Sequence, residues 1–315
     1  MSILLSVILP THNPNHEILT KTLNALRLQS LNKENWELII VDNASKKKNI
    51  LTEESLSWHP NVKVIREERL GLTWARIAGI NNSCGELIVF TDDDNILSGE
   101  YLGKALNLFK VNLDLGVIGG LVSGEFEKEP EEWFWKTGIT LGLQNFGKEI
   151  RLAKWKSSLV VDRYYPDFSP IGAGMVIRAR LAREYVKNTL EDKHSVISDR
   201  VGNKLSSGGD NDIVLFSLLN GWQVGYSPEL KLKHLIPSFR LRKDYLAKLN
   251  HDSSKSWVLV LNKYNIRIWR KISRFSLIPR KLKFYFVYKA WKGASEYIRW
   301  RGVCGTLEGL AYLKT

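Results

Sequence analysis

The sequence predicts an α/β fold, in which a mostly parallel sheet carries helices on both faces and a basic helical region follows at the C-terminus. Over residues 1–95, short apolar runs rich in Val and Ile alternate with segments of helical periodicity. These apolar runs are continuous, which is typical of parallel strands buried on both faces.

The first part of the chain contains the clearest elements. We expect strands at Ile3–Leu9, Glu37–Val41, Val62–Ile65 and Glu86–Phe90. We expect helices between them at Glu17–Gln29, Ile50–Ser57 and Leu72–Asn82. This alternation brings the carboxyl ends of the strands to one edge of the sheet, where α/β proteins bind their ligands.

The later elements are less periodic. A helix is expected from Ser98 to Val111, with Ser98 as its N-cap. A further helix is expected at Asp212–Asn220 and a strand at Leu230–Leu235, while the chain beyond Tyr245 has the composition of basic, aromatic helices.

The charge of the chain is unevenly distributed. The net charge is +13, yet residues 1–230 hold 26 basic and 29 acidic groups. From Lys231 onward, 20 Lys and Arg face only 4 Asp and Glu. A basic excess confined to one end indicates a polyanionic partner, which is membrane phospholipid, nucleic acid or a phosphorylated substrate.

Cysteine content and the first residues bear on the cellular compartment. Cys84 and Cys304 are the 2 cysteines, which excludes a disulfide framework and a cysteine zinc site. The start, MSILLSVILP, lacks a positively charged segment and predicts a strand rather than a signal peptide. No run approaches the roughly 18 apolar residues of a spanning helix. We therefore expect a cytoplasmic protein.

Three adjacent carboxylates, Asp92-Asp93-Asp94, directly follow the strand expected at Glu86–Phe90. Such groups repel one another unless a cation or solvent neutralises them, and hard oxygen ligands suit Mg²⁺ or Mn²⁺. A solvated acidic turn is the alternative. The position at a strand end, beside other polar loops, favours the metal site.

Other polar positions carry two interpretations each. Asp210 and Asp212 follow two glycines at a helix start, so each is either a base for a hydroxyl group or a helix cap. Asp42, at the end of the second strand, either accepts a hydrogen bond from a nucleobase or caps the next helix. His234 is either a metal ligand or an incidental histidine.

The segments SVILPTHNP, WELIIVDNAS and REERLGLTWARIAGINNSCGELIVFTDDDN, taken in order, resemble the N-terminal half of family 2 glycosyltransferases. These enzymes have the GT-A fold, a Rossmann-like α/β domain. The order and spacing of the motifs are more specific than any single motif. A looser similarity continues over residues 170–242, and the basic tail shows the least.

The resemblance implies a donor site built from the strand ends. The first loop and the aspartate after the second strand hold the nucleobase in this family, which implicates Pro10, Thr11, Asn13 and Asp42.

The acidic triplet resembles the D-x-D element of the family. By that resemblance Asp92 or Asp93 faces the ribose, and Asp94 holds Mg²⁺ or Mn²⁺. Arg76 is implied to lie near the diphosphate, and His234 to help hold the diphosphate or the metal.

The segment Gly208–Ile213 is similar to the G-E-D-x-D/E-L element of the family, whose first aspartate is the catalytic base. This implies that Asp210 is the base and Asp212 a supporting acid on the acceptor side. Gly209 stands where glutamate is usual, and Gly174 lies in a glycine-rich segment similar to one on the acceptor side.

The resemblance further implies an inverting transfer of a sugar from a nucleotide-sugar, by default UDP-linked, to a glycan or lipid-linked acceptor in polysaccharide synthesis. It divides the chain into a catalytic domain at 1–240 and a helical tail at 241–315. Within the catalytic domain, 1–95 forms the nucleotide-binding half and 96–240 the acceptor-binding half.

Two other functions fit parts of the sequence. A sugar-phosphate nucleotidyltransferase usually carries a glycine-rich, basic loop after the first strand, whereas this chain has THNPN there. A nucleic-acid-binding protein using the basic tail leaves the acidic triplet unexplained, so nucleic acid is not an expected partner.

The tail also suggests contact with a membrane. Five apolar side chains fall on one face at helical spacing, with basic residues beside them: Phe284, Val287, Tyr288, Trp291 and Ile298. This pattern fits a helix lying on anionic lipid at the inner face of the plasma membrane. A packed helix with a solvated basic face is the alternative.

Overall fold

The computed structural model describes residues 3–46, 51, 53–156, 163–191, 199–200, 205–266 and 269–313. The chain forms two compact units. The first comprises Met1–Glu125, Gly142–Val196 and Ile213–Leu235, and the second Phe126–Leu141, Ile197–Asp212 and Ile236–Thr315. The domain boundary expected at residue 240 stays a prediction.

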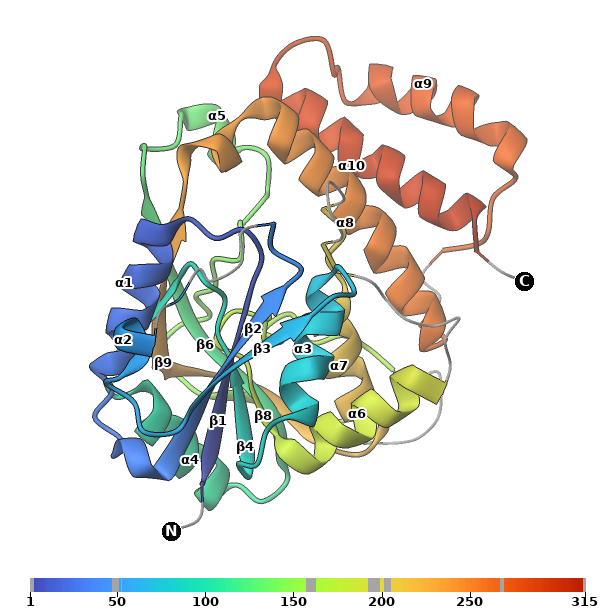
Figure 1. Cartoon of the computed structure of the whole chain (residues 1–315). Coiled ribbons are helices and arrows are strands. Elements are labelled where there is room, and N and C mark those ends of the chain that lie inside the picture. The colour runs from blue at the N-terminus through green and yellow to red at the C-terminus, as the bar shows by residue number, and fades with distance from the viewer. Residues whose placement is uncertain are drawn as a thin grey trace. The chain divides into compact units, whose positions relative to one another are not determined.

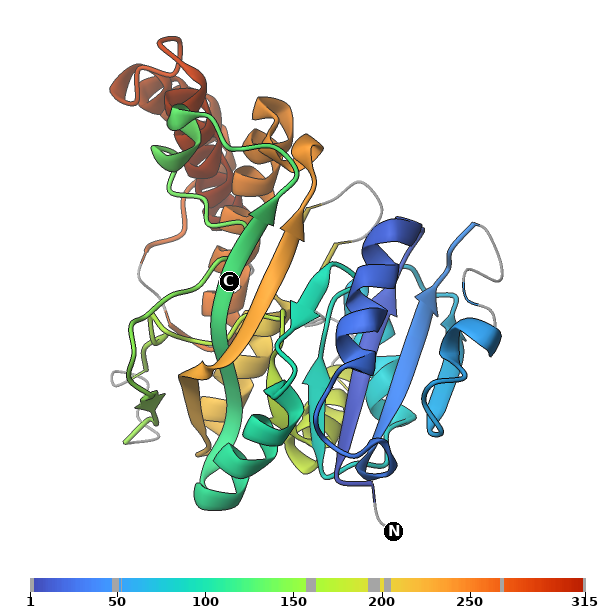
Figure 2. The same cartoon turned by 90° about the vertical axis from the view of Figure 1, so that its left-hand side faces the viewer.

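Four parallel strands form one side of the sheet in the first unit and confirm the four expected strands (Figure 2). They are β1 (Leu5–Thr11), β2 (Trp36–Asn43), β3 (Val62–Glu67) and β4 (Leu87–Phe90). Because they are parallel, their polar carboxyl ends lie at the same edge of the sheet, as expected.

The other side of the sheet includes antiparallel pairs. The strand order is β3-β2-β1-β4-β8-β6-β9-β5, with β7 paired to β9. These strands are β5 (Asn95–Leu97), β6 (Leu115–Phe126), β7 (Arg151–Ala153), β8 (Val176–Arg178) and β9 (Gln223–Ile236). The strand predicted at Leu230–Leu235 is therefore the second half of a longer one.

Helices cover both faces of the parallel strands, which confirms the predicted fold class. Residues of α1 (His16–Arg27) and α4 (Tyr101–Val111) share one buried cluster with Leu5, Val7 and Leu9 of β1. On the other face, α3 (Leu72–Asn81) packs so closely that a Cβ on Gly79 would lie 2.4 Å from Ile8. The remaining helices of the first unit are α2 (Glu53–Leu56), near the predicted Ile50–Ser57, and α6 (Ala179–Glu191).

One predicted helix start is wrong. Helix α4 begins at Tyr101 with Glu100 in the N-cap position, not at Ser98. The backbone N–H of Ser98 donates to the carbonyl of Lys231, which continues the pairing of β5 with β9. The backbone of Ser98 is thus hydrogen-bonded to the sheet, and the helix begins after it.

The second unit is mainly helical. It contains α5 (Glu132–Trp135), α8 (Lys243–Lys263), α9 (Leu277–Val287) and α10 (Ala294–Ala311), and α7 (Gly209–Leu219) begins in it. Glycines bring α8 and α10 together, since a Cβ on Gly305 would lie 2.0 Å from the carbonyl oxygen of His251. In the described part of the chain, no helix combines the length and apolarity needed to cross a membrane.

The single amphipathic helix expected for the tail is wrong. Helix α9 ends at Val287 and α10 begins at Ala294, with Lys289 between them at a φ of 51°. Ile298 is fully buried, so it does not share an exposed face with Trp291, which is 53% exposed.

A buried histidine in the first unit makes stability depend on pH. Burial, with a smaller effect from Lys33, lowers the pKa of His59 to about 4. Its ring packs edge-on against Trp36 and its Nδ1 accepts the N–H of Asn61 at 3.1 Å. The neutral ring therefore fits the folded state and the charged ring does not.

We predict that the free energy of unfolding falls as the pH is lowered from about 6.5 to about 4, because only the unfolded chain then takes up this proton. In His59→Gln this pH-dependent loss should be smaller by about 1–3 kcal/mol, measured by urea denaturation across that window. The exposed His16→Gln serves as the control. An unchanged pH profile in His59→Gln would contradict the assignment.

Candidate functional site

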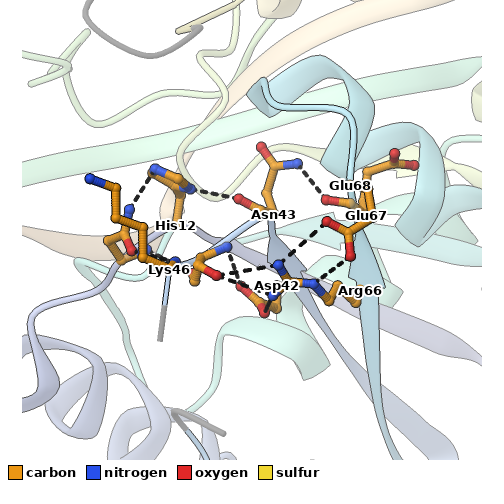
Figure 3. A network of polar contacts seen from close by, with 9 residues as sticks. His12, Asp42, Asn43, Lys46, Arg66, Glu67 and Glu68 are labelled. Carbon is orange, nitrogen blue, oxygen red and sulfur yellow. Dashed lines mark hydrogen bonds and ion pairs between the residues drawn. The ribbon is translucent and has the colours of Figure 1, made fainter. Parts of the chain in front are cut away.

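The ends of β1 and β2 bring two predicted base-binding residues together. Thr11 and Asp42 are partners in the parallel register, and Pro10 is buried one position earlier opposite Val41. Asp42 accepts a hydrogen bond from Arg66 at 2.5 Å and one from the backbone N–H of Ser45 at 3.1 Å (Figure 3). One face of the Asp42 carboxylate is thereby fixed by the end of β3.

The loop after β1 is tied to the loop after β2. Asn13, at a φ of 47°, donates its backbone N–H to Ser45 at 2.8 Å and accepts the N–H of Lys46 at 2.9 Å. His12 Nδ1 lies 2.6 Å from the carbonyl oxygen of Asn43 (Figure 3). The left-handed backbone of Asn13 is thus held by its contacts with Ser45 and Lys46 in the loop after β2.

Asn43 is a positioning residue that the sequence analysis did not identify. Its buried side chain accepts the N–H of Gly71 at 2.7 Å and donates to the carbonyls of Glu67 and Arg69. It therefore shapes the loop that leads into α3. In the sequence, only the position of Asn43 directly after Asp42 indicated that it lies near the site.

Two side chains of the acidic triplet contact predicted donor-site residues in the first unit. Asp93 accepts a hydrogen bond from Thr11 at 2.5 Å, which joins the triplet to the end of β1. Asp92, a third exposed, lies 3.8 Å from Arg76. The predicted ribose, base and diphosphate residues thus adjoin one another.

Asp94 and His234 form a buried pair in the first unit. Their Oδ2 and Nε2 atoms lie 3.3 Å apart, and both side chains are about 10% exposed. The register of β5 with β9 produces this proximity, because Asn95 is paired with His234. The pairing of β5 with β9 thereby brings together two residues that lie far apart in the chain.

Arg76 and Gly174 lie in closely packed surroundings. Arg76 is buried and lies over the ring of Phe90 at 5.3 Å, and a Cβ on Gly172 would lie 2.2 Å from its guanidinium. Gly174 has a φ of 71°, and its carbonyl accepts the hydroxyl of Tyr101 at 2.5 Å. Only glycine fits at 174, and its predicted place on the acceptor side stays a prediction.

The start of α7 carries the predicted base. Asp210 is half-buried, and its carboxylate accepts the N–H of Asn211 at 2.9 Å. Asp212 is fully buried and lies 2.8 Å from Lys263 and 2.8 Å from the hydroxyl of Tyr264. Asp212 therefore anchors the helix start to α8 within the second unit, which fits a supporting role.

A buried carboxylate takes the space beside Gly209. Asp199 accepts the backbone N–H groups of Gly208 and Gly209 at 2.6 and 2.8 Å. A Cβ at position 209 would lie 2.2 Å from Asp199 Oδ2, so the usual glutamate does not fit here. Asp199 lies in a segment without periodicity, and the sequence carried no signal for it.

We predict that Asp199→Asn lowers the free energy of unfolding by about 1–3 kcal/mol, because it weakens charge-assisted hydrogen bonds to two buried amides. Urea denaturation at neutral pH measures this. The exposed Asp167→Asn is the matched control and should be neutral. Equal stability of the two variants would show that Asp199 does not hold the helix start.

The residues present fit a divalent cation bound together with a diphosphate. The described residues contain no group of three or more His, Cys, Asp or Glu able to hold a metal by themselves. Mg²⁺, however, is commonly held by one or two carboxylates, with phosphates and water completing the shell. Asp94 supplies one such carboxylate, and the imidazole of His234 lies beside it as a nitrogen donor.

Comparisons with known proteins agree on the family. The model of glycosyl transferase family 2 matches residues 6–185. An uncharacterized glycosyltransferase of Haemophilus influenzae is 34% identical over 116 residues, covering 36% of this chain and 37% of that protein. Glycosyltransferase AglE of Haloferax volcanii is 30% identical over 119 residues, covering 37% of this chain and 38% of that protein. The matches thus span less than half the length of these relatives.

Solved structures show the same fold. The structure of Staphylococcus aureus TarS residues 1–349 in complex with UDP-GlcNAc has a TM-score of 0.52 and 15% identity, and the match covers 98% of this chain and 90% of that one. Longer TarS gives a TM-score of 0.52 with 16% identity, covering 98% of this chain and 55% of that one. The fold is therefore GT-A. Because the family model also matches more than half of its residues, the chain belongs to glycosyl transferase family 2.

Proposed function

We propose that this glycosyltransferase moves a sugar from a UDP-linked donor, with inversion, to a hydroxyl of a glycan or lipid-linked acceptor in cell-surface polysaccharide synthesis. The observation that carries the proposal is the proximity of Asp94 and His234, 3.3 Å apart, in the first unit, which also holds Asp42 at the end of β2 and Asp92 beside Arg76 of α3. The complexes of TarS with UDP and with UDP-GlcNAc support a UDP-linked donor.

Each group has a defined role in the proposed site. Asp42 accepts a hydrogen bond from the base, Asp92 or Asp93 faces the ribose, and Arg76 offsets the charge of the diphosphate. Asp94 and His234 hold the cation, with Mg²⁺ or Mn²⁺ supplying Lewis-acid neutralisation of the diphosphate when bound.

Asp210 performs the proton transfer. As the acceptor oxygen attacks the anomeric carbon, Asp210 takes up the hydroxyl proton and the bond from that carbon to the diphosphate breaks. The nucleoside diphosphate leaves from the opposite side, which inverts the anomeric centre. Positioning and charge stabilisation supply the remaining rate enhancement.

A donor screen tests the proposal. The full chain is incubated with UDP-, GDP- and TDP-sugars and Mn²⁺, and release of the nucleoside diphosphate is measured with and without EDTA. We expect slow hydrolysis of a UDP-sugar that EDTA abolishes. Release only from GDP- or TDP-sugars would overturn the choice of UDP, and EDTA-resistant release would overturn the metal.

A further inference from the structure

Helix α9 presents a row of apolar side chains to solvent. Phe275, just before the helix, is 97% exposed, and Ile278, Leu282 and Phe286 are 80%, 56% and 59% exposed. The last three follow one another at intervals of four residues, so they lie on one side of the helix. We call these four residues the α9 stripe. Helix α9 has no buried residue of its own.

The opposite side of α9 is firmly held within the second unit, where α9 runs alongside α10 (Figure 1). Lys281 forms an ion pair with Glu308 at 2.7 Å, and Trp300 donates its indole N–H to the carbonyl of Lys281 at 2.9 Å. The ring of Tyr285 packs edge-on against Trp300. The stripe is therefore exposed because the helix is fixed with this side outward.

The Glu308 carboxylate reinforces this attachment. Partial burial raises its pKa, but hydrogen bonds from Lys281 and His251 outweigh burial and lower the pKa to about 2. Glu308 thus stays charged at neutral pH, and the ion pair that orients α9 persists there.

Basic residues surround the stripe. Residues 253–295 contain 11 Lys and Arg and no Asp or Glu. Arg280, Lys283 and Lys289 are exposed on α9 and just after it. Exposed apolar groups beside exposed cations are the composition of a helix that lies in a membrane interface.

We propose that the α9 stripe inserts into the surface of an anionic lipid bilayer, with the flanking cations bound to its headgroups. A second copy of this chain would bring the same acid-free basic segment against itself, which charge repulsion opposes. Nucleic acid would engage the cations but would leave Ile278 and Leu282 without an apolar environment. An anionic bilayer satisfies both kinds of side chain, and this inference is independent of the sugar transferred.

Vesicle flotation of the full chain tests the proposal. The vesicles consist of phosphatidylcholine alone or of phosphatidylcholine mixed with phosphatidylglycerol, at low salt. We expect binding to the mixed vesicles only. Replacing the stripe with glutamine, a good helix former, should lower the partition coefficient roughly 100-fold. That variant is Phe275→Gln, Ile278→Gln, Leu282→Gln and Phe286→Gln.

A matched control removes equally exposed apolar side chains elsewhere. Val111 and Leu113, in the first unit, are 81% and 75% exposed, and Val111→Gln with Leu113→Gln should leave binding unchanged. A separate variant, Arg280→Gln with Lys283→Gln, should weaken binding roughly fivefold for each charge removed, and high salt should weaken wild-type binding. Circular dichroism establishes that every variant is folded.

Three outcomes would overturn the proposal. The first is no binding to the mixed vesicles at low salt, and the second is equal loss of binding in the stripe variant and the control. The third is that light scattering detects a dimer that the stripe variant loses, or that a gel shift with DNA or RNA depends on the stripe.

Discussion

Asp210→Asn should retain UDP-sugar binding and lower the rate of transfer by roughly 10²–10⁴-fold, the contribution of an aligned general base. The amide has nearly the same shape as the carboxylate but does not accept the acceptor's proton. Asp210 accepts the adjacent N–H of Asn211, an interaction that the amide oxygen preserves. The start of α7 should therefore remain folded.

Two measurements separate the role of Asp210 from a structural one. Calorimetric titration with a UDP-sugar and Mn²⁺ should give the same affinity for Asp210→Asn and wild type, while nucleotide release in the presence of acceptor should fall. The exposed Asp114→Asn is the control for loss of a charge. Normal turnover by Asp210→Asn would remove Asp210 from the role of base.

Asp94→Asn should abolish the dependence of donor binding on Mn²⁺ and lower transfer by roughly 100-fold or more, because cation stabilisation of the leaving diphosphate contributes several kcal/mol. Asp94 is buried beside His234, so water has little access to its carboxylate. Calorimetric titration with Mn²⁺ in the presence of UDP measures the change in affinity for the cation. Asp94→Asn with unaltered Mn²⁺ and UDP affinity would show that the cation binds elsewhere.

His234 provides an independent comparison within the same prediction. If it shares the cation with Asp94, His234→Gln should weaken Mn²⁺ binding as well, roughly 10–100-fold. Asp114→Asn should again be neutral. If Asp94→Asn weakens Mn²⁺ binding and His234→Gln does not, Asp94 is a ligand of the cation and His234 only orients the Asp94 carboxylate.

The parallel half of the fold was predictable because local pattern and topology agree there. Apart from Ser6 and Glu37, the strands Leu5–Thr11 and Trp36–Asn43 are apolar until their polar ends, Thr11 and Asp42-Asn43. Parallel pairing then places Thr11 beside Asp42 without further information. The positions of most of the predicted donor-side residues follow from this one rule.

The remaining features depend on contacts between distant residues, which local pattern does not encode. The pairing of Asn95 with His234 unites two segments far apart in the chain. Ser98 was expected to cap a helix, but the sheet recruits its backbone. Asp199 fills the space beside Gly209 from a segment with no periodicity.

The tail shows a different limit. A helical wheel drawn over residues 284–298 assumes one continuous helix, whereas the chain turns at Lys289. The exposed apolar row therefore lies one segment earlier, on Ile278, Leu282 and Phe286. The basic charge of the tail is evident from the composition alone, whereas the surface that presents it is visible only in the structure.

A crystal structure of the chain with Mn²⁺ and a UDP-sugar, in which anomalous scattering locates the cation, tests the central claim most directly. Our account predicts one Mn²⁺ ion bound by Asp94 and His234 and by the diphosphate, with Asp210 facing the anomeric carbon from the side opposite the leaving group. Mn²⁺ bound away from Asp94, or Asp210 directed away from the donor sugar, would contradict it.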